Sequence, residues 1–308
     1  MLGHYPRTVD VVRKEGTSEV WISSPVPALR GSILCNSDKK GTKMSNFVDQ
    51  QYLLNEEYKN ASHLNARIQF FQRFSTNGVD PYRWIFDHFD LRPSSRILEL
   101  GCGPGFLWQK NLDRIPSDWT ITLSDFSPGM LQEAQHNLRD KSPNFSFQVI
   151  DAQTIPLETS RFDAVIANNI LYHVPDRQRA LSEIHRVLKP DGYFYASTIG
   201  EESFSELNRL MGQNGLTPWA KRLGFSLENG GEQLSFWFIH LDLHRLENTL
   251  MITETEPLLQ TMRPGMGDTT IDEETFRHLR EGIDQEVTQH GGFGSTMHLG
   301  LFVAHGRK

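Results

Sequence analysis

Cysteine is scarce in this sequence: Cys35 and Cys102 are the only two among 308 residues. They cannot form a disulfide framework, and their spacing is not the CxxC of a zinc site. The N-terminus lacks the apolar core of a signal peptide, and no apolar run is long enough to cross a bilayer. These absences favour a protein of the reducing cytoplasm with no membrane partner.

Positive charge is also in short supply. Lys and Arg number 31 against 38 Asp and Glu, which gives a formal net charge of −7. A nucleic-acid partner is therefore not expected, because neutralising phosphates requires a basic face. The hydrophobic fraction of 38% is typical of globular proteins. A chain of this length is expected to form one large domain with insertions, or one domain with a lid.

The first 43 residues show neither helical nor strand periodicity and scatter Gly, Pro and Ser among charges. We expect residues 1–43 to be a flexible extension, either an upstream addition that is not native or a native tail that docks on the body. Met44 then begins the segment MSNFVDQQYLLNEEYKN, which looks like a natural start of the protein. Residues 44–90 are expected to form N-terminal helices that act as a lid, and residues 91–308 the main domain.

Strand patterns alternate with helix patterns from residue 96 onward, which is typical of a parallel sheet with helices on both faces. Residues 200–233 break this alternation, so we expect them to be an insertion that covers the substrate. A helix that carries Phe276 and Ile283 precedes the last strand, at 298–304. The earlier strands are expected at 96–100, 120–126, 145–151, 162–174, 193–199 and 235–247.

The first of these strands runs into a glycine-rich turn, RILELGCGPGF, residues 96–106. Glycines permit positive φ angles and let a ligand approach the backbone at the start of a helix. The dinucleotide pattern GxGxxG would need a glycine at Phe106, so it is not met. Glu99, two positions before Gly101, would repel a diphosphate. A ligand with a cationic amine, a ribose and no phosphate fits this turn better.

The next two strands also end in a carboxylate. Asp125 closes the second strand, where a carboxylate can accept hydrogen bonds from both hydroxyls of a ribose. Asp151 closes the third and can accept from the exocyclic amine of a base. Because the carboxyl ends of parallel strands meet at one edge of a sheet, we expect both to lie near Glu99.

The motifs ELGCGPG, LSDFSPGML, VIDAQTIPL, FDAVIANNILYHVPD and HRVLKPDGYFYAST follow one another between about residues 94 and 199. In them the sequence resembles the class I S-adenosylmethionine-dependent methyltransferases, and more narrowly their bacterial small-molecule, type 11-like branch. The resemblance implies an α/β, Rossmann-like fold with a seven-stranded, mostly parallel sheet, helices on both faces and the last strand antiparallel. Asp191 departs from it, since the family often has glycine there.

The resemblance also implies the ligands. The cofactor is S-adenosylmethionine, which leaves as S-adenosylhomocysteine, and the partner is a small-molecule methyl acceptor. Glu99 and Asn168 are expected near the methionine part and Asp125 on the ribose. Phe126 and Met130 are expected against adenine. The full set of expected cofactor-binding residues is Glu99, Gly101, Cys102, Gly103, Gly105, Asp125, Phe126, Met130, Asp151, Ala152 and Asn168.

Methyl transfer from a sulfonium is an in-line displacement, for which no metal is expected. His173 is the candidate general base, because it follows the fourth strand and an imidazole has an ordinary pKa near 6.5. The alternative is that His173 orders its loop. Tyr172 is a candidate substrate-binding residue, or it packs in the core.

Three further groups of residues each allow two interpretations. Cys102 is a small filler between glycines or a reactive thiol. Arg67 and Arg73 either reach the cofactor's carboxylate or are solvated and ion-paired. The run His240, Asp242 and His244 alternates along one strand, as on a solvated face, although a metal site has the same residue types.

The function of the whole chain also has more than one reading at this point. The chain is an enzyme, a silent cofactor-binding scaffold or sensor, or a nicotinamide oxidoreductase, and tRNA or protein acceptors are a further variant of the enzyme. Neither the acceptor nor the oligomeric state follows from the sequence.

Overall fold

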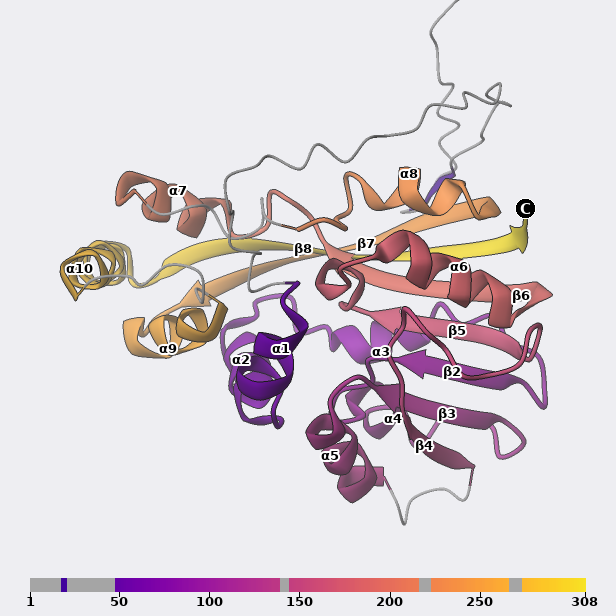
Figure 1. Cartoon of the computed structure of the whole chain (residues 1–308). Coiled ribbons are helices and arrows are strands. Elements are labelled where there is room, and N and C mark those ends of the chain that lie inside the picture. Colours follow the sequence, from indigo (N-terminus) through magenta and orange to yellow (C-terminus); the bar gives the residue numbers. More distant parts are fainter. Residues whose placement is uncertain (1–17, 21–47, 139–143, 216–222, 266–272) are drawn as a thin grey trace, which may run out of the picture.

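The computed structural model describes residues 18–20, 48–138, 144–215, 223–265 and 273–308. Its centre is one mixed sheet in the order β1-β7-β8-β6-β5-β2-β3-β4 (Figure 1). The strands are β1 Ser18–Val20, β2 Arg96–Leu100, β3 Thr120–Asp125, β4 Phe145–Val149, β5 Phe162–Asn168, β6 Leu188–Ile199, β7 Phe238–Ile252 and β8 Phe293–Arg307.

The pairing directions confirm the predicted fold class. Strands β2 to β6 pair in parallel, and β8 is antiparallel to both β6 and β7. An additional strand, β1, pairs with the outer edge of β7, with Ser18 opposite His244. It lies within residues 1–43, where the sequence shows no strand pattern. Strand β5 ends at Asn168 rather than at 174, because Leu171–His173 turns into a 3-10 helix, η2.

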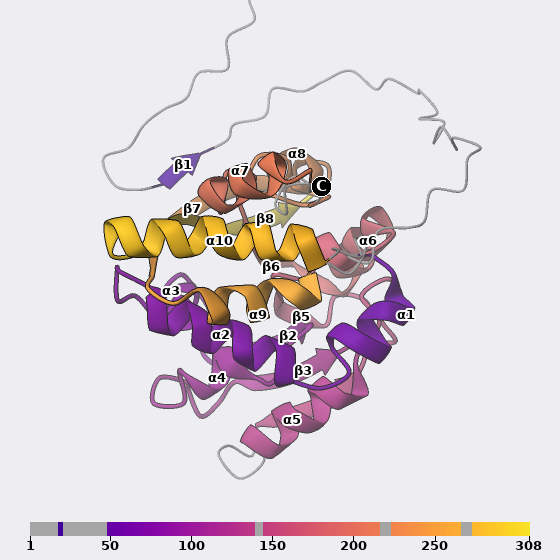
Figure 2. The same cartoon turned by 90° about the vertical axis from the view of Figure 1, so that its left-hand side faces the viewer.

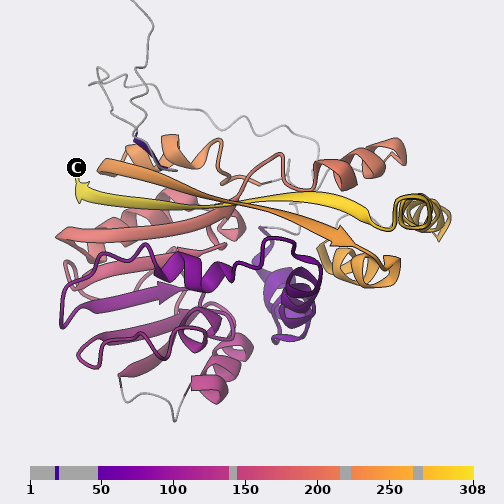
Figure 3. The ribbon, with the colours of Figure 1, turned by 180° about the vertical axis from the view of Figure 1, so that it is seen from behind.

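Helices bury both faces of the sheet (Figures 1 and 3). On one face, α3 (Pro81–Phe86), α4 (Phe106–Gln109) and α5 (Pro128–Leu138) share a buried cluster with β2, β3 and β5. On the other, α6 (Arg177–Val187) and α8 (Gly230–Ser235) share a buried cluster with β2, β5, β6, β7 and β8. In the described part of the chain, no helix combines the length and the apolar character needed to cross a membrane.

Strands β7 and β8 continue beyond the end of β6. Strand β6 pairs with β8 only as far as Ile199 opposite Leu299, whereas β7 and β8 stay paired to Ile252 opposite Phe293. The extra length forms a two-stranded projection, seen at the left of Figure 1, which we call the cap arm. It is surrounded by α2 (Ser62–Phe74), α7 (Ser205–Gln213), α9 (Thr255–Gly265) and α10 (Glu273–His290) (Figure 2).

Within the range 44–90 that the sequence predicts as a lid, we keep the name lid for residues 50–60. They precede α2 and include α1 (Gln50–Tyr52) and the π-helical η1 (Leu53–Glu57). Two close approaches hold the lid on the start of α5. The Ser127 hydroxyl donates to the Tyr58 carbonyl at 2.6 Å. A Cβ added to Gly129 would lie 1.9 Å from the Lys59 carbonyl oxygen. The lid therefore crosses the carboxyl edge of the sheet, where β3 ends.

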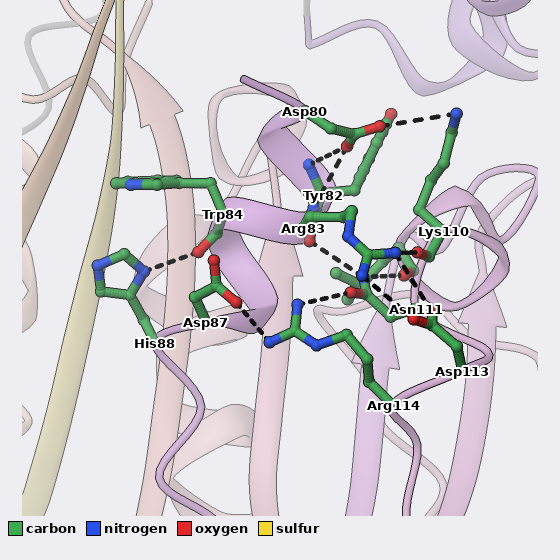
Figure 4. A network of polar contacts seen from close by, with 11 residues as sticks. Asp80, Tyr82, Arg83, Trp84, Asp87, His88, Lys110, Asn111, Asp113 and Arg114 are labelled. Atoms are coloured by element: carbon green, nitrogen blue, oxygen red, sulfur yellow. Dashed lines mark hydrogen bonds and ion pairs between the residues drawn. The ribbon is translucent and has the colours of Figure 1, made fainter. Parts of the chain in front are cut away.

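A polar network fixes α3 on the segment that follows α4, residues 110–114 (Figure 4). Arg83 bonds both the Lys110 carbonyl at 2.8 Å and the Asp113 carboxylate at 3.2 Å. Arg114 pairs with Asp87, and Asn111 donates to the Tyr82 carbonyl at 3.2 Å. These exposed pairs contribute little stability each. Their consequence is positional, because they hold α3, which carries Tyr82, beside the turn after β2.

Candidate functional site

The three predicted carboxylates meet at the carboxyl edge of the sheet. Glu99 and Asp125 lie on the adjacent strands β2 and β3, and both are buried. Asp151 lies just past the end of β4 and forms an isolated bridge with Thr154, so it follows the strand rather than closing it. The edge opens into two cavities, one of about 540 Å³ and one of about 100 Å³.

Glu99 is held in the larger cavity by two donors. The Trp108 indole donates to its Oε2 at 2.6 Å and the Asn168 amide to its Oε1 at 3.2 Å. Burial raises the pKa of Glu99 to about 7, against the effect of both hydrogen bonds. The Oδ1 atoms of Asn168 and Asn169 are buried there with no hydrogen-bond partner. Buried acceptors without donors are costly, and an ammonium group would satisfy them.

Asp125 lies in the smaller cavity and accepts from two backbone amides. These are the N–H groups of Gly103 at 2.9 Å and Ser127 at 2.8 Å. Burial raises the pKa of Asp125 to about 6, and the hydrogen bonds lower it. A carboxylate has about four lone-pair positions. Asp125 can therefore still accept from a ligand's hydroxyls.

The three glycines of the turn all have positive φ, but they serve different contacts. A Cβ at Gly101 would lie 2.3 Å from the Ile170 side chain, and one at Gly105 would lie 2.6 Å from Leu138. Gly105 lines neither cavity, in contrast to the expectation that it lies along the ligand; it lets α5 pack against the turn. Burial raises the pKa of the Cys102 thiol well above its usual value, which favours a filler over a reactive thiol.

The two cavities share part of their lining. Gly101, Ile170 and His173 line both, as do Leu53 and Tyr58 of the lid. The remaining predicted site residues divide between them. Asp125, Phe126, Asp151 and Ala152 line the smaller cavity; Glu99, Cys102, Gly103, Met130, Asn168 and Tyr172 line the larger. Met130 therefore lies in a different cavity from Phe126, although both are expected against adenine.

Asp151 already accepts from a side-chain amide. The Gln50 Nε2 of the lid donates to its Oδ2 at 3.3 Å, and Gln153 donates to both oxygens at 3.1 Å. These amide N–H groups have the same donor chemistry as an exocyclic amine on a base. The environment of Asp151 thus fits the group that the sequence assigns to it, and the lid contributes to that environment.

His173 contacts a lid residue that the sequence analysis did not single out. Its Nε2 lies 2.9 Å from the Tyr58 hydroxyl, and the two rings meet edge to face. Burial raises the pKa of Tyr58, so its phenol stays protonated, and the tautomer of the imidazole sets which of the two groups donates. Tyr58 and His173 are 115 residues apart. No local spacing pattern marks such a pair.

The two arginines of α2 have different surroundings. Arg67 lines the larger cavity and pairs with Glu57 of the lid. Arg73 pairs with Glu254, and its side chain is 54% exposed against 16% for Arg67. Both are ion-paired, as the second of the two interpretations of these arginines requires. Only Arg67 is placed to meet a ligand in the larger cavity.

The alternating trio on β7 has histidine neighbours. The His240 ring stacks on His305 with centroids 4.6 Å apart, and the His244 ring lies 4.2 Å from His88. Burial lowers the pKa of His244 and of His305. Over the described residues, no group of three or more His, Cys, Asp or Glu side chains is arranged to hold a metal ion.

Together, an open, mostly parallel sheet, a glycine turn after its first strand and carboxylates at its edge form a Rossmann-like site at the carboxyl ends of the strands. The comparisons with known proteins agree. Residues 97–192 match the family model described as a methyltransferase domain. The chain therefore carries a class I methyltransferase domain.

Curated relatives match parts of the chain. A malonyl-[acyl-carrier protein] O-methyltransferase of Acetivibrio thermocellus is 30% identical over 163 residues, which cover 52% of this chain and 54% of that protein. The highly reducing polyketide synthase verA of Penicillium polonicum is 33% identical over 106 residues, 33% of this chain and 4% of the synthase. The chain thus spans about half of the first relative and a small part of the second.

Solved structures share the fold. A putative methyltransferase from Bacillus halodurans covers 74% of this chain and 98% of its own, with a TM-score of 0.54 at 15% identity. The Haemonchus contortus phosphoethanolamine N-methyltransferase 2 in complex with S-adenosyl-L-methionine covers 84% of this chain and 60% of its own, with a TM-score of 0.52 at 18% identity. At these identities the likeness concerns the fold alone.

Proposed function

We propose that the protein transfers a methyl group from S-adenosylmethionine to a small-molecule acceptor. The observation that carries this proposal is the placement of Glu99, Asp125 and Asp151 along one edge, facing two cavities with a shared lining. A nucleoside joined to an amino acid needs such an elongated site, with acceptors for a base amine, ribose hydroxyls and an ammonium group. The domain match supports the same cofactor.

The residues that would hold the cofactor follow from the contacts. Asp151, with Phe126 and Ala152, would hold the base, and Asp125 the ribose. Glu99 would hold the ammonium, with the unpartnered oxygens of the two asparagines. We assign the cofactor's carboxylate to Arg67, because a guanidinium has five N–H donors and Glu57 uses only part of them.

When bound, the cofactor supplies a methyl group already activated by a sulfonium. The chain then has to align the acceptor with the methyl and to exclude water. Alignment alone can lower a barrier by roughly 7 to 11 kcal/mol. The lid, held on α5 and in contact with His173, encloses the shared part of the two cavities and would keep the acceptor unsolvated.

His173 is our proposed base for an acceptor that must lose a proton. Its Nε2 shares a hydrogen bond with the Tyr58 hydroxyl. In the tautomer with Nε2 unprotonated, the imidazole can take the acceptor's proton by two routes: directly at Nε2 once Tyr58 turns away, or through Tyr58 as a relay. In the second case the acceptor's proton moves to Tyr58 as the Tyr58 proton moves to His173. Tyr172 lines the same cavity and is our proposed substrate contact.

The small-molecule acceptor draws support from the largely apolar lining of the larger cavity and from relatives that are named for carrier-bound and polyketide chemistry. A silent scaffold would bind the cofactor without turnover. A tRNA or protein acceptor would have to present a single group inside the cavity. The compartment we propose is the cytoplasm.

The test combines binding with product formation. We expect isothermal titration calorimetry to show S-adenosylhomocysteine binding, and mass spectrometry to show a methylated product from a panel of small acceptors. Asp125→Asn should weaken binding at least tenfold. The matched control is Asp118→Asn, because Asp118 is an exposed carboxylate with two internal hydrogen bonds at the opposite end of β3.

Absence of binding to the unsubstituted chain would refute the proposed function. Binding without any product would favour the scaffold. Binding that falls equally in both aspartate variants would refute the assignment of the ribose to Asp125.

A further inference from the structure

The larger cavity has a second end, away from the carboxylates. Its wall is formed by α2, the end of β6, the segment before α7, and the start of the cap arm. We call the following residues the cap wall: Ile68, Phe71, Ile199, Phe204, Leu246, Met297 and Leu299. All seven side chains are apolar. Any acceptor that faces the cofactor's methyl from this end must lie against them.

The cap wall has a fixed shape, because a packed core lies behind it. Leu250, Ile252, Leu258, Leu279 and Ile283 are buried in that core with Phe70 and Phe74. Phe71, Ile199 and Met297 pack against it while remaining partly exposed. The Phe71 and Phe204 rings are nearly parallel, with centroids 6.1 Å apart, and form one continuous aromatic surface. Apolar contact with such a surface is favourable in proportion to the area buried.

Each charged side chain that the described structure places in the larger cavity already has a protein partner. Glu57 pairs with Arg67 through Oε1, while its Oε2 is buried with no hydrogen-bond partner. Glu99 accepts from Trp108 and Asn168. Asp80 caps α3 and lies 3.6 Å from Lys110. Arg67 and Glu99 also belong to the proposed cofactor site, so a charged acceptor would compete with the cofactor for them or leave its own charge unpaired, and an unpaired buried charge is costly.

The polar groups nearest the cap wall are also engaged with each other. Asn248 is buried, and its amide donates to Ser75 Oγ at 3.1 Å. The Ser75 hydroxyl in turn lies 3.3 Å from Asn248 Oδ1. This pair can orient a neutral polar atom but supplies no charge.

We propose that the acceptor is an uncharged molecule with an extended aliphatic or aromatic body, which lies on the cap wall while its nucleophilic atom faces the donor. This rests on the proposed methyl transfer. It narrows the acceptor class, because small amines and phosphate esters lack the apolar body, and long-chain amines and carboxylic acids would place a charge against an apolar wall. The cap arm is then the element that sets acceptor specificity.

The test uses matched probes: 1-hexanol, 1-heptanol, 1-octanol, octanoate and octylamine, titrated into the full chain with and without saturating S-adenosylhomocysteine. We expect affinity to rise about fourfold per added methylene in the alcohols. Octanoate and octylamine should bind at least tenfold more weakly than octanol. Equal or tighter binding of a charged probe, or alcohols that bind alike at all lengths, would overturn the proposal.

Two variants with more polar side chains locate the binding. Met297→Gln and Ile68→Thr should each weaken octanol at least fivefold. Their controls are Met251→Gln and Ile239→Thr, exposed positions of the same residue types on β7 outside the cavity, which should leave octanol affinity unchanged. Equal losses in variants and controls would overturn the proposal.

The two proposals can fail separately. If S-adenosylhomocysteine does not bind but affinity still rises with alcohol length, the methyltransferase function is refuted and the apolar binding at the cap wall stands. Binding of S-adenosylhomocysteine with no octanol pattern would refute only the acceptor class.

Discussion

At the scale of single residues, Glu99 meets two opposing requirements. The fold buries it, which favours the protonated acid, whereas an ammonium ligand requires the ionised form. Trp108 and Asn168 reduce the conflict by donating hydrogen bonds, but the pKa of about 7 shows that burial has the larger effect. Cofactor binding at this site should therefore be coupled to loss of a proton.

We expect the affinity for S-adenosylhomocysteine to rise by up to about tenfold per pH unit as pH increases toward the pKa of Glu99, about 7, and then to level off. Calorimetry in buffers of different ionisation enthalpy should show proton release on binding below that pH. Glu99→Gln should bind weakly and without this proton release. A flat affinity profile for the unsubstituted chain would contradict the assigned contact.

The raised pKa of Glu99 has the opposite effect on the stability of the ligand-free fold, which falls as pH rises, whereas the affinity for the cofactor rises. Because the pKa of Glu99 lies above its ordinary 4.5, its contribution to stability is present below pH 4.5 and is lost as pH rises through about 7. Glu99→Gln should remove this loss. Denaturant unfolding between pH 4 and pH 8 measures it, and a variant with the same pH dependence as the parent would exclude Glu99 as the source.

His173 gives a second prediction at this scale. His173→Ala should keep S-adenosylhomocysteine binding and lower methyl transfer by roughly 10² to 10⁴, as for loss of a general base. His136→Ala, an exposed histidine on α5, is the control for both measurements. Loss of cofactor binding in His173→Ala would instead assign this residue to the ordering of its loop.

At the scale of elements, the lid completes the proposed cofactor site. It brings Gln50 to Asp151 and Tyr58 to His173, and it is held by α5 through Ser127. Glycine at position 129 is what permits this contact, because the Lys59 carbonyl occupies the space of a side chain. The lid thus depends on a close backbone approach rather than on a large apolar contact.

Gly129→Ala should displace the lid and weaken S-adenosylhomocysteine binding by about tenfold or more, with the sheet still folded. The reason is the distance of 1.9 Å between the new Cβ and a backbone oxygen. Gly212→Ala on α7 is the matched control, since its Cβ would meet nothing within 4 Å. Calorimetry measures the loss of affinity, and thermal unfolding measures any loss of fold stability. Equal affinities in both variants would show that the lid contact is not needed for binding.

At the scale of the whole molecule, the parallel part of the sheet and the cap arm line different parts of the larger cavity. The parallel part supplies the carboxylates and the glycine turn, while the projecting β7 and β8 supply the apolar wall. The insertion at 200–233 contributes Phe204 and Leu223 to the cavity, and β7 and β8 add Leu246, Met297 and Leu299. Residues 216–222 of that insertion lie outside the described residues.

A chain that begins at Met44 should fold and keep its cofactor affinity. It would lose the pairing of β1 with β7, which involves only three residues at the sheet edge. Thermal unfolding with and without S-adenosylhomocysteine measures both properties, because a ligand that binds the native state raises its midpoint. A large loss of stability or of binding would show that the β1–β7 pairing, or another part of residues 1–43, is needed for the fold or the site.

The amino-acid sequence by itself determined the alternation of strands and helices and the placement of Glu99, Asp125 and Asp151 at strand ends, because periodicity and turn chemistry act over a few residues. Only the tertiary structure decided which groups meet them. Trp108 on Glu99 and Tyr58 on His173 are contacts between elements, the latter 115 residues apart. The cap arm is likewise a matter of register between β7 and β8, since the alternating pattern of a strand does not specify how far its partners extend.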